Sequence, residues 1–215
     1  MTHPNFDFVQ ARQNMIENQL RPAEVSHVKL IEIMRVLPRE YCVLNNQKEM
    51  AYSDINISLF DQRYLSEPRV LARLVQLANI EAKQKILVIG AGTGYLSAII
   101  SLMGAEVYAL EENEKLSVIG KKFCNEYASD VQWCDGILQD GYPKNKFYDV
   151  IIIDGCIKEI SKKLIDQLNK NGHIITVLKK DGDIGHAVTA KKTDEGIVIQ
   201  KSFYAALPYL PEFMK

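Results

Sequence analysis

The stretch ILVIGAGTGYLSAI, residues 86–99, places three glycines in a turn between an apolar run and the start of an expected helix. Gly90, Gly92 and Gly94 let the backbone bend tightly and let a ligand approach main-chain N–H groups. A dinucleotide fingerprint would have its third glycine one residue later, where Tyr95 stands. The spacing therefore argues against NAD and favours another nucleotide; a tight turn without a ligand is the alternative.

Two carboxylates follow the next expected strand, VYAL. Glu111 stands 21 residues after Gly90, where a carboxylate can accept both hydroxyls of a ribose. Glu112 beside it is a second candidate for the cofactor site. A ribose held without a pyrophosphate indicates S-adenosylmethionine. The alternative is that an acidic residue after a strand serves only as a solvated helix cap.

The third expected strand ends in WCDG, and the fourth ends in Asp154, Gly155 and Cys156. Asp135, followed by Gly136, is placed to accept a hydrogen bond from the adenine amino group. Both aspartates are also common turn-forming residues, which is the alternative for each. We expect Trp133 to belong to the core rather than to stack on adenine.

The elements that must position these residues follow from the apolar pattern. Two helices are expected within residues 8–36, with a break at Arg21–Pro22, and Pro38 closes the second. An amphipathic helix begins at Pro68. Beyond it, strands are expected at 85–89, 107–110, 131–134, 149–153 and 173–176, with weaker candidates at 187–192 and 197–203, and helices at 95–103, 115–127 and 160–168.

This alternation predicts an α/β fold with a doubly wound, mostly parallel, Rossmann-like sheet and an N-terminal helical extension. With 215 residues and 47% hydrophobic composition, the chain can build one sizeable core. We therefore predict a single domain, residues 1–215. Within it, residues 1–83 form N-terminal helices and a substrate loop, and residues 84–215 form the cofactor-binding core.

The balance of 26 basic and 27 acidic residues gives a net charge of -1, so no global field favours nucleic acid or anionic lipid. No apolar run reaches the roughly 18–20 residues that span a bilayer. The beginning of the chain, MTHPNFDFVQAR, lacks the apolar centre of a secretory signal. We expect a cytoplasmic protein without membrane or nucleic-acid partners.

The four cysteines form no CxxC pair, and the four histidines are scattered without spacing that would bring two onto a metal. We expect reduced, partly buried thiols and no metal site.

Together these motifs resemble the class I S-adenosylmethionine methyltransferases, and within them the protein-L-isoaspartate O-methyltransferases. The resemblance extends over roughly residues 10–180. It is carried by ENQLRP, IEIMRVLPREYCV, AYSDINISL, VIGAGTGYLSAIISLMGAEVYALEENEKL, WCDGILQDG and LNKNGHIITVL.

The family's substrate loop typically reads glycine, glutamine, threonine, isoleucine, serine, a variable residue and proline. The matching positions here are residues 62–68, QRYLSEP, which keep the serine and the proline. The resemblance makes Ser66 the active-site serine and brings Tyr64 and Leu65 to the cofactor. Serine before a helix-initiating proline is also common for capping, which is the alternative for Ser66.

The resemblance implies methyl transfer from S-adenosylmethionine to the carboxylate of L-isoaspartyl residues in damaged proteins or peptides, a repair reaction. Such a carboxylate is already ionised at pH 7, so the chemistry needs no general base. Because the substrate loop and the segment after residue 176 depart from the family, two alternatives stay open. One is a different acceptor, such as a small molecule, with the tail YAALPYLPEF over the mouth of the site; the other is a cofactor-binding protein without turnover.

Overall fold

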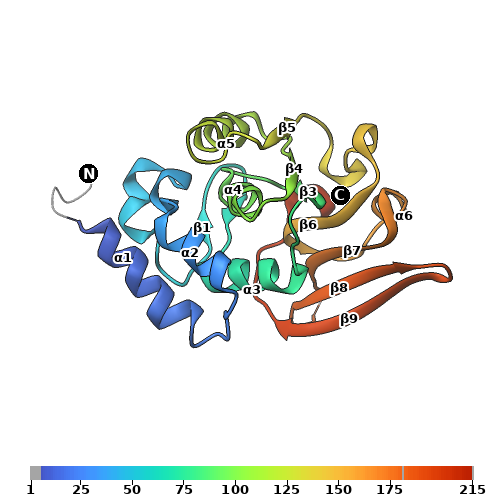
Figure 1. Cartoon of the computed structure of the whole chain (residues 1–215), viewed down its shortest axis with the longest axis horizontal. Coiled ribbons are helices and arrows are strands. Elements are labelled where there is room, and N and C mark those ends of the chain that lie inside the picture. Colours follow the sequence, from blue (N-terminus) through green and yellow to red (C-terminus); the bar gives the residue numbers. More distant parts are fainter. Residues whose placement is uncertain (1–5, 181, 215) are drawn as a thin grey trace.

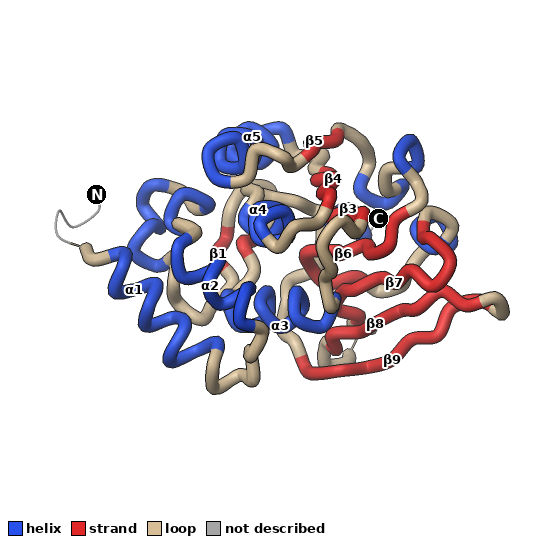
Figure 2. Tube along the Cα trace, viewed as in Figure 1, coloured by secondary structure: helices blue, strands red, loops and turns tan. Residues whose placement is uncertain are grey.

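A computed structural model describes residues 6–180 and 182–214. The N-terminal helices lie together on one side of the molecule, and the strands form a sheet through the other side (Figures 1 and 2). The first five residues of the stretch considered for a secretory signal lie outside the described ranges.

The main sheet has seven strands in the order β5–β4–β3–β6–β7–β8–β9. Their bounds are β3 Lys85–Ile89, β4 Glu106–Leu110, β5 Gln132–Cys134, β6 Tyr148–Ile157, β7 Leu168–Leu178, β8 His186–Thr193 and β9 Gly196–Tyr204. The pairs from β5 to β7 are parallel, whereas β8 and β9 add antiparallel pairs at one edge. The predicted α/β fold with a mostly parallel sheet is confirmed. β3 lies between β4 and β6, which makes this the switch point where such sheets bind ligands.

The N-terminal segment contains α1 (Phe8–Met15), which continues as a π-helical turn (Ile16–Leu20), and α2 (Val28–Val36). The expected break at Arg21–Pro22 is present, and α2 ends before Pro38. Two 3-10 helices, Arg39–Cys42 and Asn45–Met50, then lead to a small antiparallel ribbon of β1 (Ile57–Ser58) and β2 (Tyr64–Leu65). This ribbon carries the predicted substrate loop.

Three further α-helices follow: α3 (Pro68–Ala78), α4 (Tyr95–Leu102) and α5 (Glu114–Tyr127). α3 starts with its proline at the first turn, as predicted. The side chain of Asn113 caps α5 by accepting hydrogen bonds from the amides of Lys115 and Leu116.

Alternate residues of the strands face two separate hydrophobic clusters, one on each side of the sheet. Ile86 and Val88 join the larger cluster, which contains side chains of α1 to α5. Leu87 and Ile89 join the smaller cluster, which is covered by short elements and by residues near the C-terminus. Because the N-terminal helices share the larger cluster with the sheet, we propose that the chain is a single domain.

The segment between β6 and β7 departs from the sequence prediction. The expected helix at 160–168 is present but much shorter than predicted: α6 spans only Lys162–Ile165, and Leu168 already belongs to β7. Leu168 pairs with Tyr148 of β6, so sheet pairing competes with helix formation at that end. β6 also continues beyond the expected end, through Asp154 to Ile157.

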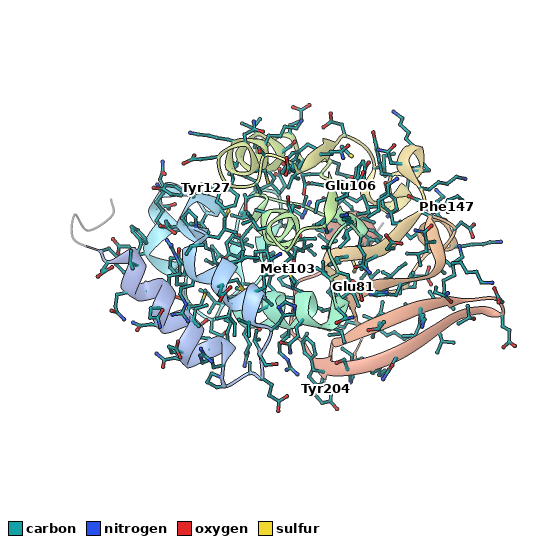
Figure 3. All side chains as sticks on the ribbon, viewed as in Figure 1. Glu81, Met103, Glu106, Tyr127, Phe147 and Tyr204 are labelled. Carbon is teal, nitrogen blue, oxygen red and sulfur yellow. The ribbon has the colours of Figure 1, made fainter. Side chains whose placement is uncertain are left out.

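After the β8–β9 hairpin, which confirms the two weaker strand predictions, the chain turns back to the sheet. Tyr204 ends β9 at the surface, with 70% of its area exposed (Figure 3). Residues 205–214 then pass the carboxyl ends of β3 and β6, where Pro208 and Leu210 bond to Cys156 and Leu210 lies against Gly90. We call residues 205–214 the closing segment.

All four cysteines are buried and free of disulfides. Within residues 6–180 and 182–214, no helix has the length and apolar character needed to cross a membrane. In the same ranges, no group of three or more His, Cys, Asp or Glu side chains is arranged to hold a metal ion.

Candidate active site

The glycine turn follows β3 at the switch point of the sheet. Gly90, Gly92 and Gly94 all have positive φ angles, of 74°, 56° and 88°, which side chains other than glycine rarely adopt. Gly94 is the N-cap residue of α4, and a Cβ there would lie 3.0 Å from the carbonyl oxygen of Gly120. The turn thus depends on glycine for both conformation and space.

Glu111, directly after β4, has a side chain with no exposed area. Its carboxylate accepts four hydrogen bonds: from the amides of Gly92 (2.7 Å) and Asn113 (2.9 Å), and from both terminal nitrogens of Arg63 (2.8 and 2.9 Å). Glu111, the residue predicted to bind the ribose, therefore lies against the glycine turn. Its carboxylate oxygens are occupied by Arg63 of the same chain.

Arg63 comes from the loop before β2 and is itself buried, with 3% of its side chain exposed. It also forms an ion pair of 3.3 Å with Glu212 of the closing segment. Burial alone would lower the pKa of Arg63, but Glu111, together with Glu212 and Asp154, more than offsets this, so the pKa is raised. The guanidinium is therefore a permanent charge at this site.

Ser66 lies at the same edge of the sheet and is buried. Its hydroxyl donates a 2.5 Å hydrogen bond to Oδ1 of Asp154 in β6, and it makes no cap contact with α3. The capping alternative for Ser66 is thus not what the structure shows. Nor is Asp154 a turn residue, because it lies within a strand.

The environment of Asp154 favours its protonated form. Burial raises its pKa, while the Ser66 hydroxyl, Arg63 and Arg39 offset part of that rise and Glu111 adds to it. This carboxyl therefore takes up a proton more readily than an exposed aspartate.

Arg39 anchors the serine from the N-terminal side. Its guanidinium is fully buried and donates to the carbonyl oxygens of Ala51 (2.7 Å) and Ser66 (2.5 Å). It also lies 5.0 Å from the centre of the Tyr95 ring, and burial lowers its pKa. Through Arg39, the 3-10 helix that follows α2 fixes the backbone of the substrate loop.

Of the remaining predicted cofactor residues, all but Leu65 lie at the rim of the site. Glu112 accepts a hydrogen bond from the amide of Leu138 (2.8 Å). Asp135 has an exposed side chain, 3.4 Å from the ammonium group of Lys121, and Gly136 after it is exposed as well. Tyr64 is partly exposed beside Arg63, whereas Leu65 is buried in the larger hydrophobic cluster. Trp133 packs against that same cluster, as expected for a core residue.

Sequence reasoning missed two features of this site. Arg39 was not singled out, since nothing in its local sequence indicates full burial. Arg63 was not singled out either, although it lies within the predicted substrate loop at residues 62–68. Its partner Glu111 stands 48 residues further along the chain, so no local spacing relates the two.

Little space is left where these groups meet. The cavity lined by Arg63, Ser66, Asp154 and the closing segment has a volume of about 10 Å³, roughly that of one water molecule. Leu210 fills the remainder: a Cβ placed on Gly90 would lie 3.3 Å from its Cδ2, and one on Gly155 would lie 2.5 Å from its Cγ.

The sheet order, the glycine turn after β3 and the carboxylate after β4 together define a class I S-adenosylmethionine-dependent methyltransferase fold. The family model described as protein-L-isoaspartate(D-aspartate) O-methyltransferase (PCMT) matches residues 10–212. The chain therefore belongs to this family, and the resemblance inferred from the sequence is confirmed.

Named relatives agree over most of the chain. It is 30% identical over 190 residues to the protein-L-isoaspartate O-methyltransferase of Gloeobacter violaceus, covering 88% of this chain and 93% of the relative. It is 31% identical over 164 residues to that of Protochlamydia amoebophila, covering 75% and 77%.

Solved structures support the fold. A protein-L-isoaspartate O-methyltransferase superposes with a TM-score of 0.81 at 23% identity, covering 93% of this chain, which spans 65% of that protein's chain. A structure from Plasmodium falciparum, described under the same enzyme name and in complex with S-adenosyl-L-homocysteine, gives a TM-score of 0.78 at 15% identity. This superposition covers 97% of this chain and 100% of the Plasmodium falciparum chain.

The family binds S-adenosylmethionine, and the glycine turn and Glu111 are the groups expected to hold it. In the conformation described here the cofactor does not fit. The oxygens of Glu111 are occupied by Arg63, Leu210 lies against Gly90, and residues 90–94 of the glycine turn are all buried.

Proposed function

We propose that this protein transfers a methyl group from S-adenosylmethionine to the carboxylate of L-isoaspartyl residues. One observation carries the proposal beyond family membership: Ser66, at the family's serine position, is buried and donates a hydrogen bond to Asp154 in β6, which pairs with the strand that leads into the glycine turn. This setting supports our proposal that the serine contacts the acceptor group next to the cofactor.

Ser66 is proposed to orient the acceptor carboxylate by donating a hydrogen bond to it. A carboxylate with a reference pKa near 4 is ionised at neutral pH, so it can attack without a general base. The positive charge of Arg39, which donates to the carbonyl oxygen of Ser66, favours an anionic group at this position. Serine therefore acts as a positioning donor and not as a nucleophile.

The partners proposed are damaged proteins and peptides that carry isoaspartyl groups. Our assignment of the site is unchanged from the sequence analysis: Ser66, Tyr64, Leu65, the three glycines of the turn, Glu111, Glu112, Asp135 and Gly136. Glu111 and the glycines have the strongest support, because their backbone and side-chain groups form one hydrogen-bonded unit. Asp135 and Glu112 lie at its rim.

The function is tested by incubating the full-length protein with S-adenosylmethionine labelled in its methyl group. One sample contains an isoaspartyl peptide and the other its normal aspartyl twin. We expect base-labile label on the isoaspartyl peptide at least tenfold above the aspartyl control, since methyl esters of carboxylates hydrolyse readily in base.

Two results would contradict the proposal. Equal labelling of both peptides would show that the acceptor is not the isoaspartyl group. Absence of label on both, under conditions in which cofactor binding is measured, would favour a different acceptor or a protein without turnover.

A further inference from the structure

Two parts of the chain that are far apart in sequence fill the same edge of the sheet. Arg63 reaches the glycine turn from the loop before β2, and Leu210 reaches it from the closing segment. The ion pair between Arg63 and Glu212 joins the two parts to each other. Together they cover the groups that are expected to hold the adenosyl cofactor.

Arg63 would compete directly with a ribose for the carboxylate of Glu111. A carboxylate offers about four acceptor positions, and all four at Glu111 are used by Gly92, Asn113 and the two nitrogens of Arg63. The two amides, that of Gly92 in the glycine turn and that of Asn113 at the N-cap of α5, leave room for further donors. The ribose hydroxyls can therefore bind Glu111 only after Arg63 has moved away.

Leu210 competes for the space above the glycines. It lies against Gly90 and Gly155, the positions where the absence of a side chain would otherwise admit a ligand. The closing segment is held there by a short ladder: the amide of Cys156 donates to Pro208, and the amide of Leu210 donates back to Cys156, both at 2.9 Å. The side chain of Gln139 also donates to the carbonyl oxygen of Glu212.

We propose that Arg63 and the closing segment form a latch that competes with S-adenosylmethionine for one site. The structure then represents the closed state, and the cofactor binds an open state in which the ladder to β6 and the pair to Glu111 are broken. The inference rests on the proposed use of S-adenosylmethionine, yet it concerns binding alone and is tested without any methyl acceptor.

The anatomy of the latch is suited to reversible opening. The closing segment is held by the contacts described above, by hydrogen bonds from Asn56 to Ala206 and from Tyr209 to Lys179, and by the burial of Leu207. Because residues 205–214 are not a strand of the seven-stranded sheet, they can leave by local unfolding while the sheet stays intact. A ligand that binds only the open state has its apparent affinity reduced by the fraction of molecules that are open. Weakening the latch should therefore tighten cofactor binding.

The first test measures the Kd of S-adenosyl-L-homocysteine by calorimetry for the full-length protein and for Arg63→Gln and Leu210→Ala. We expect each substitution to lower the Kd at least tenfold. Arg69→Gln is a matched control, since Arg69 is half exposed on α3 and pairs with Asp54 and Glu67. Leu164→Ala is the second, since it truncates a buried leucine of the same hydrophobic cluster on α6.

Both controls should keep the wild-type Kd. Equal Kd values for the wild type and the two latch variants would overturn the proposal. The proposal would also be overturned if neither the wild type nor any variant bound S-adenosyl-L-homocysteine, because there would then be no cofactor site for the closing segment to compete for. An equal gain in Leu164→Ala would also count against it, since general loosening would explain the effect.

A second measurement uses the wild-type protein and so does not depend on how the variants fold. Hydrogen exchange at the amides of Cys156 and Leu210 should become at least tenfold faster when S-adenosyl-L-homocysteine is added, because binding releases the ladder. Amides of the β8–β9 hairpin serve as the internal reference. Slower or unchanged exchange at Cys156 and Leu210 in the bound protein would contradict the latch, whether or not the protein methylates isoaspartyl peptides.

Discussion

The hydroxyl of Ser66 has one hydrogen to donate, and in this structure it donates it to Asp154. A substrate carboxylate needs that same hydrogen. When Asp154 is protonated it can itself donate to the Ser66 oxygen, which frees the serine hydrogen for the substrate. The raised pKa of Asp154 therefore suits the role proposed for Ser66.

Replacing Ser66 tests this role at the level of one atom. We expect Ser66→Ala to lower kcat/KM for an isoaspartyl peptide about 10- to 100-fold, because a hydrogen bond to a charged group contributes about 1.5–3 kcal/mol. Ser58→Ala, at an exposed position in β1, is the control and should leave steady-state kinetics unchanged. A Ser66→Ala protein with wild-type kcat/KM would remove our assignment.

The pKa of Asp154 gives a pH-dependent prediction for stability. A carboxyl whose pKa is raised in the folded state stabilises the fold fully below its unfolded value, about 3.9, and loses this contribution as pH rises through the folded value. Asn has no charge to bury. Relative to the wild type, the melting temperature of Asp154→Asn should therefore rise between pH 4 and pH 7.

The exposed Asp130 provides the matched control, and Asp130→Asn should show no such trend. If the difference between Asp154→Asn and the wild type stays constant or reverses across this range, then Asp154 does not carry a raised pKa in the folded protein.

The residues of the site that sequence patterns predicted are those whose role is local. The glycines lie within one turn, and Glu111 follows one strand, so spacing along the chain locates them. Arg63 and Leu210 reach the same point only through the tertiary fold, and no period or motif announces their contacts. The sequence suggested the tail YAALPYLPEF over the mouth of the site, in the alternative with a different acceptor, but no pattern indicated that Arg63 and Leu210 would cover Glu111 and Gly90.

Among the elements, α5 shows how the glycine turn is supported from outside. A Cβ on its Gly120 would lie 2.2 Å from the ring of Trp133 in β5 and 2.9 Å from the carbonyl oxygen of Gly92. The helix therefore packs against both β5 and the turn at a distance that only glycine permits. This contact fixes where the turn sits above β3.

Gly120→Ala tests that packing because two effects oppose each other. Alanine in a helix is favoured over glycine by about 1 kcal/mol, whereas overpacking a close contact costs about 1–3 kcal/mol. Since backbone as well as a ring must move, we expect a net loss of about 1–2 kcal/mol in the free energy of unfolding by urea.

The companion variant Trp133→Leu should reduce the cost of Gly120→Ala, with a coupling above about 0.5 kcal/mol in a double-mutant cycle. A Gly120→Ala protein more stable than the wild type would show that helix propensity outweighs the contact.

Elements with a strong local signal were predicted well, and the exception is instructive. β3 and α3 have continuous apolar runs or a clear helical stripe, and both begin at the expected residues. The predicted helix at 160–168 is cut short because Leu168 pairs with Tyr148, while Gln167 bonds to the backbone of Asp140 and Tyr142. Tertiary contacts, which the local sequence does not reveal, therefore determine where the helix ends in that segment.

At the scale of the whole molecule, family membership and closure of the site belong to one account. The family model extends to residue 212 and so includes most of the closing segment. The same chain thus supplies the groups expected for the cofactor and the groups that cover them. Opening the latch should expose an isoaspartyl-directed methyltransferase site.

The most direct test of this account is methyl transfer by the double variant Arg63→Gln/Leu210→Ala, in which closure no longer limits cofactor binding. Labelled S-adenosylmethionine is supplied with the isoaspartyl peptide or with its aspartyl twin. The account predicts base-labile label on the isoaspartyl peptide at least tenfold above its twin. Equal label on the two peptides, or no label while the cofactor is bound, would contradict it.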